Sequence, residues 1–411
     1  MTEHGPLKEA PVAETLRYPI PAETALEPPA EWARLRDECP VARVTLASGD
    51  EAVLITRYDD VRAVLSDPRF TRTGPGRGAR VSDAEEGGVF SSEMATVLPQ
   101  HGEAHLRWRR MIGKWFTARR MTALRPGIEA MAGQLVDEMV AKGAPADLKA
   151  ALGFPLPVWV ICDMLGVPDA DRDRFAHWSD MMLSMTRFTQ EEMAAGQREF
   201  GAYMAAHLHA KRADPGEDLL SALLRETDAA GEPLSDAVLV ATGIGLLVAG
   251  HETTANMIVK MVGMLLADRD RWAQLLADRS LVRTAVEETL RMDANAGFGM
   301  VRYFDQEVEI AGTTLPSGTT AVCSMAAANR DERRFTDADR VDLRRGPNPH
   351  LAFGAGAHAC IGQPLARTEL QAVLDVLLRR LPSLELAVDV DDLRRVEGLV
   401  VGGLRELPVR W

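Results

Sequence analysis

The stretch of residues 234–270, LSDAVLVATGIGLLVAGHETTANMIVKMVGMLLADRD, constrains the fold more than any other feature of this sequence. Ser235 and Asp236 are residue types that cap and begin helices. About 30 helical residues, at a rise of 1.5 Å each, span on the order of 45 Å, enough to cross a domain. Because the middle of the stretch is apolar, other elements have to cover it. The sequence therefore predicts a large helical core around this helix.

Strand patterns occupy two shorter parts of the chain. Residues 41–56 place alternating apolar side chains around the turn Ser48-Gly49-Asp50, which predicts a β-hairpin. Residues 307–325 also have strand character, with a turn at Pro316-Ser317-Gly318. We expect a mainly α fold with a small β region.

Helical patterns fill most of the remaining sequence. Asp59 is expected to cap a short helix, a run of helices follows from about 103 to 292, and a last helix covers about 361–380 before a β-like C-terminus. Residues 1–30 hold six prolines and predict an extended strap with little regular structure. Residues 71–92 are rich in glycine and predict a long loop, a feature that is often functional. We expect residues 1–411 to form a single domain.

Composition excludes several classes of protein. The formal net charge of −13 is unfavourable for binding nucleic acid or anionic membranes. The apolar run 238–249 is too short to cross a bilayer, and the N-terminus lacks a signal-peptide pattern. Four scattered cysteines, none in a CxxC pair, argue against both a disulfide framework and a zinc site. These features predict a cytoplasmic protein with no membrane attachment.

The segment FGAGAHACIG, residues 353–362, carries the strongest chemical signal. Its glycines allow the backbone to approach a flat ligand closely. A predicted helix begins directly after Cys360, and the N–H groups of a helix N-terminus favour a thiolate. Phe353 is placed to shield the sulfur from water. Taken alone, Cys360 would be better explained as a buried structural cysteine beside a glycine turn.

Polar residues interrupt the long apolar helix at His251-Glu252-Thr253-Thr254. A buried acid is costly unless it is paired or functional, so Glu252 is a candidate for chemistry. Gly250 is expected to weaken the helix just before it and to leave room for a ligand or water. The alternative is a capping or solvent-facing polar patch.

Three motifs, of which two are described above, together resemble the cytochrome P-450 family. They are F-x-x-G-x-H-x-C-x-G at 353–362, A-G-x-(D/E)-T at 249–253, and E-x-x-R at Glu288 and Arg291. The whole chain is similar to soluble actinomycete members that modify macrolides and other polyketides. The resemblance implies a triangular helical domain with haem b between the long central helix and the helix of the cysteine loop. Cys360 would then be the iron ligand.

The resemblance also implies roles for other positions. Thr253 would hold dioxygen and its proton network, and Glu252 would relay protons. Glu288 and Arg291 would brace the core, with Arg340 completing their ion cluster; taken alone, such a pair is most often a surface salt bridge. The remaining residues implied to bind haem, its propionates included, are Ala249, Gly250, Phe353, Gly354, His105, Arg109, Arg302 and His358.

One departure from the family pattern concerns the start of the helix that carries His105. Family members often read D-P-P-E-H there, whereas this chain has His101-Gly102-Glu103-Ala104-His105. His105 is retained, but the way in which the chain begins this helix is open. For each basic residue considered alone, a solvated surface position is an equal alternative.

Substrate and partner predictions follow from position alone, and each of the residues concerned could instead belong to the core or to a solvated face. The substrate-pocket candidates are Phe90, Met94, Met181, Met185, Ile244, Leu247, Val248, Ala294, Phe298 and Val400. Methionines and small residues there predict a roomy apolar pocket. The basic segment considered for docking an acidic ferredoxin contains Arg107, Arg109, Arg110, Lys114, Arg119 and Arg120.

The sequence thus predicts a monooxygenase that hydroxylates or epoxidises a bulky natural product such as a macrolide. Electrons would come from NAD(P)H through a separate ferredoxin and ferredoxin reductase. One alternative keeps the haem but uses peroxide-driven or oxidative-coupling chemistry. Another is a non-catalytic haem sensor.

Overall fold

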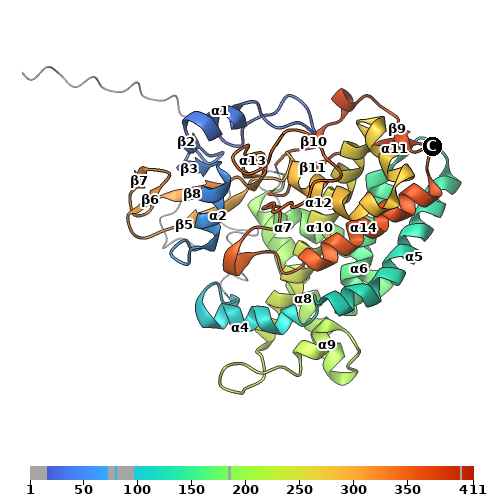
Figure 1. Ribbon diagram of the computed structural model, residues 1–411. Coiled ribbons are helices and arrows are strands. Elements are labelled where there is room, and N and C mark those ends of the chain that lie inside the picture. The colour runs from blue at the N-terminus through green and yellow to red at the C-terminus, as the bar shows by residue number, and fades with distance from the viewer. Residues whose placement is uncertain (1–15, 73–78, 81–96, 184–186, 399) are drawn as a thin grey trace, which may run out of the picture.

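The computed structural model describes residues 16–72, 79–80, 97–183, 187–398 and 400–411. Figure 1 shows most of the helices gathered on one side of the molecule and most strands on the other, where α1, α2 and α13 also lie. The mainly α fold with a small β region is therefore confirmed. Most of the predicted loop 71–92 lies outside the described residues.

The long helix α10 (Asp236–Leu266) is the centre of the helical part. Its N-cap is Ser235, whose side chain accepts a hydrogen bond from the N–H of Val238, as the sequence predicts. It packs against α6 (Pro155–Leu165), α8 (Gln190–Ala213) and α14 (Gln363–Arg380). Although the uninterrupted apolar run is short, α10 as a whole is long and apolar enough to cross a membrane. Because most of its apolar window is buried inside the protein, it is a core helix.

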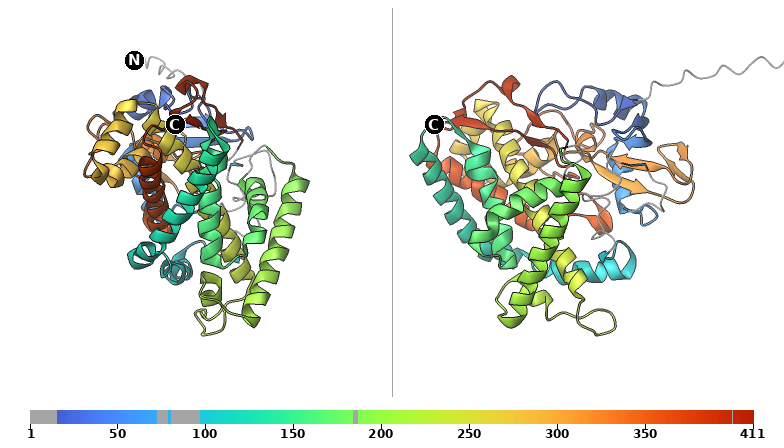
Figure 2. Two further views of the ribbon diagram at one scale, coloured as in Figure 1. Left: turned by 90° about the vertical axis from the view of Figure 1, so that its right-hand side faces the viewer. Right: turned by 180° about the vertical axis from the view of Figure 1, so that it is seen from behind.

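The other helices surround α10. Helix α5 (Ala118–Lys142) lies along α14, and Figure 2 shows α7 (Arg172–Leu183) and α8 side by side at one edge of the molecule. The remaining helices and helical turns are α1 (Glu31–Glu38), α4 (Gly102–Gly113), η1 (Lys149–Gly153), η2 (Asp169–Asp171), α9 (Leu219–Leu223), α11 (Arg269–Ala277), η3 (Arg279–Leu281), α12 (Val282–Met292), α13 (Met325–Ala328) and η5 (Val390–Asp392).

The largest sheet has the order β1-β2-β3-β8-β5. The predicted hairpin forms its centre: β2 (Val41–Thr45) pairs antiparallel with β3 (Glu51–Ile55), with Val41 opposite Ile55. Strand β8 (Thr320–Cys323) lies parallel to β3 and antiparallel to β5 (Met300–Tyr303). The predicted turn at Pro316-Ser317-Gly318 separates β7 (Thr313–Leu315) from β8, and β6 (Val308–Ile310) pairs with β7.

Near the C-terminus, short strands close the helical side. Strand β12 (Pro408–Arg410) pairs with β4 (Ala146–Asp147) and β9 (Glu385–Leu386). Strand β10 (Arg395–Val396) pairs with β11 (Gly403–Leu404). The latter hairpin packs against α10 through β11, which brings the end of the chain to the central helix.

One expectation about the N-terminal part, the cap of the short helix, was wrong. Helix α2 (Tyr58–Ser66) begins before Asp59, and the carboxylate of Asp331 accepts a hydrogen bond of 3.0 Å from the N–H of Tyr58. A residue distant in sequence therefore satisfies this helix start. In the described end of the 1–30 strap, β1 (Leu16–Arg17) adds a two-residue parallel strand to β2.

Candidate active site

The backbone of the cysteine loop is fixed by hydrogen bonds and by glycine. The N–H of Cys360 donates to the carbonyl of Phe353 at 2.8 Å, and the N–H of Gly354 donates to Leu351 at the same distance. Gly356, in the turn η4 (Gly356–His358), has a φ of +70°, and a Cβ there would lie 2.6 Å from the Cα of Ser66. The loop is therefore pressed against the end of α2, which only glycine permits at this position.

Cys360 differs from the other cysteines of the chain. It is exposed, whereas Cys162 and Cys323 are buried and Cys39 is partly buried. Although the residue as a whole is exposed, desolvation of its sulfur raises the pKa of the thiol. The backbone N–H groups of Gly362 and Gln363, at the start of α14, oppose this shift. Cys360 thus combines exposure of the residue as a whole with backbone donors that favour the thiolate.

Phe353 connects the loop to helix α12 through two charged residues that the sequence did not single out. The guanidinium of Arg367 lies 4.5 Å from the centre of the Phe353 ring. Arg367 Nε also donates to Oε1 of Glu287 at 2.7 Å, and His350 Nε2 lies 3.1 Å from Oε2. Burial raises the pKa of Glu287, but His350 and Arg367 outweigh it and lower the value to about 2. The sequence feature that could have identified Glu287 was a glutamate directly before the E-x-x-R motif.

The predicted brace contains Glu288 and Arg291, but its third member is Arg345. Glu288 and Arg291 are completely buried, and Arg291 Nη2 lies 2.8 Å from Glu288 Oε1. Arg345 Nε lies 3.0 Å from the same oxygen. Burial opposes ionisation of Glu288, yet Arg291 and the other donors lower its pKa. The assignment of Arg340 was wrong: its side chain is exposed, and only its carbonyl accepts bonds from Arg291 and Arg345.

The four residues predicted to bind propionates lie together. His105 and His358 have ring centres 4.3 Å apart, and Arg109 donates to the carbonyl of Ala359 inside the cysteine loop. Arg302 lies on β5 and is buried. The altered start of α4 is accommodated by Gly102, whose φ of +68° carries the chain into the helix and leaves His105 on its buried face.

A fifth basic residue, Arg72, belongs to the same group, which we call the basic cluster (Arg72, His105, Arg109, Arg302 and His358). Burial, followed by the charge of Arg72, lowers the pKa of His358 to about 3, and burial lowers that of Arg302 to about 10. Among the described residues, no carboxylate bonds to any side chain of the cluster. A dianionic group fits such an arrangement, as the two propionates of haem do.

Thr253 lies on a distinct face of α10. Gly245, Ala249 and Thr253 follow one another at four-residue spacing and are exposed, whereas almost all of their neighbours on the helix are buried. The hydroxyl of Thr253 donates to the carbonyl of Ala249 at 2.8 Å. This face of α10 is exposed, whereas the other sides of the helix are packed against neighbouring elements.

Gly250 has a different role from the one expected. Helix α10 continues through this position without a break. A Cβ on Gly250 would lie 2.8 Å from the side chain of Ile161 on α6. The glycine therefore permits close packing of α10 on α6, and no distorted turn is required to explain it.

Several predicted pocket residues belong to the core. Ile244, Leu247 and Val248 are buried in the main hydrophobic cluster, because they project from α10 on faces other than that of Thr253. Ala294 packs near Trp32, and Phe298 packs in the cluster around Tyr18, with the two rings 5.0 Å apart. The sequence alone could not show which face of α10 is buried and which is exposed. Phe90, Met94 and Met185 lie outside the described residues.

Val400 and Met181 remain compatible with a pocket wall. Val400 is partly exposed; its N–H donates to Leu183 at the end of α7, and its carbonyl accepts from Phe298. These bonds join three segments that are distant in the sequence. Met181, on α7, is buried and packs against Gly196 of α8.

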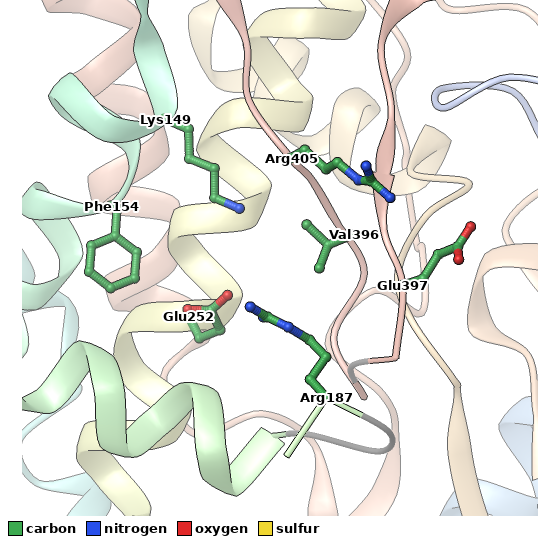
Figure 3. Close-up of a pocket in the computed structure, with 7 residues that line it drawn as sticks. All are labelled: Lys149, Phe154, Arg187, Glu252, Val396, Glu397 and Arg405. Carbon is green, nitrogen blue, oxygen red and sulfur yellow. The ribbon is translucent and has the colours of Figure 1, made fainter.

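Glu252 faces away from Thr253, into a pocket of about 500 Å³. The pocket is lined by Lys149, Phe154, Arg187, Glu252, Val396, Glu397 and Arg405, and in Figure 3 the side chains of Lys149 and Arg187 extend toward Glu252. Asn256 Nδ2 donates to Oε1 of Glu252 at 2.7 Å. Oε2 is buried with no hydrogen-bond partner among the described residues and lies 3.7 Å from Nε2 of His251.

Comparison with known proteins assigns this arrangement to a family. The Cytochrome P-450 family model matches residues 264–402. The chain is 42% identical to mycinamicin IV hydroxylase/epoxidase of Micromonospora griseorubida, over 97% of this chain and 99% of that protein. It is also 42% identical to nocardicin C N-oxygenase of Nocardia uniformis subsp. tsuyamanensis, with the same coverage.

Solved structures agree. A putative thioether synthase involved in the tailoring step of griseoviridin superimposes with a TM-score of 0.90 at 40% identity, over 97% of this chain and all of that one. Identity at this level extends over nearly the whole length of the chain, beyond the motifs of the cysteine loop and of α10. On this basis the chain belongs to the cytochrome P-450 family of haem monooxygenases.

Proposed function

We propose that this monooxygenase inserts one oxygen atom from O₂ into a bulky apolar natural product of the macrolide or polyketide class, by hydroxylation or epoxidation. The observation that carries the proposal is the pairing of an accessible Cys360 with a face of α10 on which Thr253 is exposed. The relatives named for mycinamicin and nocardicin act on natural products, which supports the substrate class.

The cofactor would be held by residues from both halves of the chain. Cys360 would bind the haem iron, Phe353 would limit water at the sulfur, and His105, Arg109, Arg302 and His358 would bind the propionates. Ala249, Gly250 and Gly354 belong to the backbone around it. When bound, haem with a thiolate ligand supplies O₂ activation and O–O cleavage.

Thr253 is suited to handle protons on the substrate side. Its hydroxyl proton is donated to Ala249, so the lone pairs of its oxygen remain available to accept a hydrogen bond. Thr253 can therefore hold a water or a protonated oxygen species in place while it stays fixed to the helix. This requires no change in the backbone of α10.

Glu252 is suited to supply those protons from solvent. The pocket of about 500 Å³ brings charged and solvent-accessible groups to the opposite side of α10 (Figure 3). Glu252 is one residue from Thr253, and one of its oxygens has no described hydrogen-bond partner. We propose that protons enter through this pocket and pass around α10 by way of Glu252.

The small side chains beside Thr253 favour a bulky substrate. A Cβ on Gly245 would have no atom within 4 Å, whereas one on Gly243 or Gly250 would meet a neighbouring side chain at 2.8 Å. Packing therefore explains Gly243 and Gly250 but not Gly245. We propose that Gly245 and Ala249 leave room for the ring of the substrate.

Electron transfer partners are proposed to be an acidic ferredoxin and its NAD(P)H-dependent reductase in the cytoplasm. The basic segment around α4 is the candidate surface, but part of its charge is already compensated. Arg110 pairs with Glu103, and Lys114 pairs with Glu226 at 2.6 Å. Arg119 and Arg120, at the start of α5, are the more promising contacts, although Arg120 also lies over the ring of Trp115.

The first test is the spectrum of the reduced protein with carbon monoxide. A Soret band at the red-shifted position of a thiolate ligand is expected, and Cys360→Ser should abolish it while Cys162→Ser, at a buried cysteine, should not. The second test is Thr253→Ala, which should consume NAD(P)H with much less product formed. Absence of the thiolate band from the intact, haem-loaded wild-type protein would contradict the proposal.

One comparison favours a second reaction. The putative thioether synthase shares 40% identity with this chain, so oxidative coupling is an alternative outcome of the same site. Mass spectrometry of the product distinguishes the two. Hydroxylation or epoxidation adds one oxygen atom, whereas coupling within one molecule removes two hydrogens.

A further inference from the structure

Arg72 is placed beside Arg302 by the backbone. Thr71 forms an antiparallel bridge with Tyr303: the N–H of Thr71 donates to Tyr303 at 2.8 Å, and the N–H of Tyr303 donates to Thr71 at 2.9 Å. When residue 71 stands opposite residue 303 in an antiparallel pair, residue 72 stands opposite residue 302. Side chains of opposite residues project on the same face. Two guanidinium groups therefore come from neighbouring backbone positions.

Two like charges that come from neighbouring backbone positions repel each other unless an anion lies between them. Although the Arg72 residue is solvent-accessible overall, desolvation and then the charge of Arg109 lower the pKa of its guanidinium. Its charge in turn acts on His105, Arg302 and His358. No acid of the described chain pairs with Arg72.

We infer that Arg72 is a further propionate ligand of the haem, binding from the strand-like segment at 71–72 on the side facing Arg302. This rests on the proposed role of the basic cluster. Two propionates offer two charges and four acceptor oxygens, enough to engage more than the four residues that the family motifs supply. One bound propionate would also add a second link between the segment after α2 and β5, which the bridge between Thr71 and Tyr303 already joins.

The surroundings of Arg72 favour a propionate over a carboxylate on the substrate. The residues with which it interacts electrostatically include His358, two residues before Cys360, and Arg109, which donates to the loop carbonyl of Ala359. Both belong to the cysteine-loop side of the site.

The test compares Arg72→Ala with Arg69→Ala in the haem-loaded protein. Arg69 is an exposed arginine three residues earlier that pairs with Asp67. Transfer of haem to an apoprotein acceptor should be roughly 10- to 100-fold faster in Arg72→Ala, the loss expected for one hydrogen bond between charged groups. Arg69→Ala should match the wild type, and Arg72→Lys should recover part of the loss because it keeps the charge. The reduction potential should also fall in Arg72→Ala, since a nearby cation stabilises the reduced iron.

Reconstitution with haem dimethyl ester separates a direct contact from a general effect on folding. If Arg72 binds a propionate, Arg72→Ala should accelerate loss of haem but not of the diester. Equal acceleration for both, or haem loss at the wild-type rate, would overturn the inference. Unchanged haem loss with weaker binding of a carboxylate-bearing substrate would assign Arg72 to substrate instead. The carbon monoxide spectrum of each variant reports separately whether the thiolate haem site itself is present.

Discussion

Asn256 holds Glu252 from one turn farther along α10, donating a hydrogen bond of 2.7 Å to Oε1 and a second of 3.0 Å to the backbone carbonyl. Both side chains are buried. Gly403 of β11 lies so close to the Asn256 amide that a Cβ there would collide with it. The C-terminal hairpin therefore fixes the amide, and the amide fixes the acid at the end of the solvent pocket.

Replacing Asn256 should impair proton delivery without preventing substrate binding. In Asn256→Ala, Glu252 loses its only described side-chain hydrogen bond, and product formation per NAD(P)H should fall by about tenfold, less than the roughly 10²–10⁴-fold that general acid–base catalysis contributes, because Glu252 itself remains. The solvent deuterium isotope effect on turnover should increase. An unchanged isotope effect and unchanged coupling would show that Asn256 does not position the acid. The substrate-induced spin shift, measured by absorbance, serves as the control for binding.

Arg345, and not Arg340, should determine the stability of the buried brace. Arg345→Leu removes one of the charges that compensate the completely buried Glu288. Because Arg291 remains, we expect a loss of about 2 kcal/mol in the free energy of unfolding, below the range for complete loss of a buried partner. Arg340→Leu, at an exposed side chain, should change it by less than about 0.5 kcal/mol. Urea unfolding of the haem-loaded variants measures both.

Glu287 should contribute stability that is lost in acid. Its pKa is lowered to about 2 in the folded protein, from 4.5, because His350 and Arg367 outweigh the effect of burial. A depressed pKa stabilises the fold above the unfolded value and ceases to do so as the pH falls from about 4.5 toward 2. At neutral pH the shift corresponds to about 3 kcal/mol.

Unfolding free energies measured between pH 7 and pH 3 test this expectation. Glu287→Gln should be less stable than the wild type at pH 7, and the difference should shrink on acidification. Glu309→Gln, at an exposed position of β6, provides the control. A difference between Glu287→Gln and the wild type that is independent of pH would mean that packing, not charge, accounts for the role of Glu287.

Gly245 should set the size of the substrate that α10 admits. Gly245→Val and Gly245→Leu should progressively weaken the spin shift caused by a macrolide, while binding of imidazole, a small ligand of the iron, should be retained. Gly201→Leu on α8, where a Cβ would also meet nothing within 4 Å, controls for the change in helix propensity. Equal weakening for the macrolide and for imidazole would instead indicate general damage to the site.

The sequence was sufficient where a motif is local. The cysteine loop, the start of α10 at Ser235, the hairpin at 41–56 and the Glu288–Arg291 pair each depend on residues within a few positions of one another. Short-range hydrogen bonds and helical spacing determine such features, so they can be predicted without a structure.

Predictions that depended on which face of an element is buried were less successful. Ile244, Leu247 and Val248 are as apolar as pocket residues should be, yet the open face of α10 is the one with Gly245, Ala249 and Thr253. The apolar character of these side chains is equally consistent with a place in the core and with a place in the pocket wall. Only the positions of α6, α8 and α14 around the helix decide which side is covered.

The sequence by itself was sufficient to predict the family, Cys360 as the candidate iron ligand and the acid–threonine pair, because their chemistry requires particular residue types at fixed spacing. Tertiary structure alone placed Glu252 and Thr253 on different sides of α10, replaced Arg340 by Arg345, and brought Arg72 to Arg302 from 230 positions away. The physical reason is that charge and packing interactions depend on distance in space. The fold brings together residues that are far apart in the sequence, and their separation in the sequence does not predict their contact.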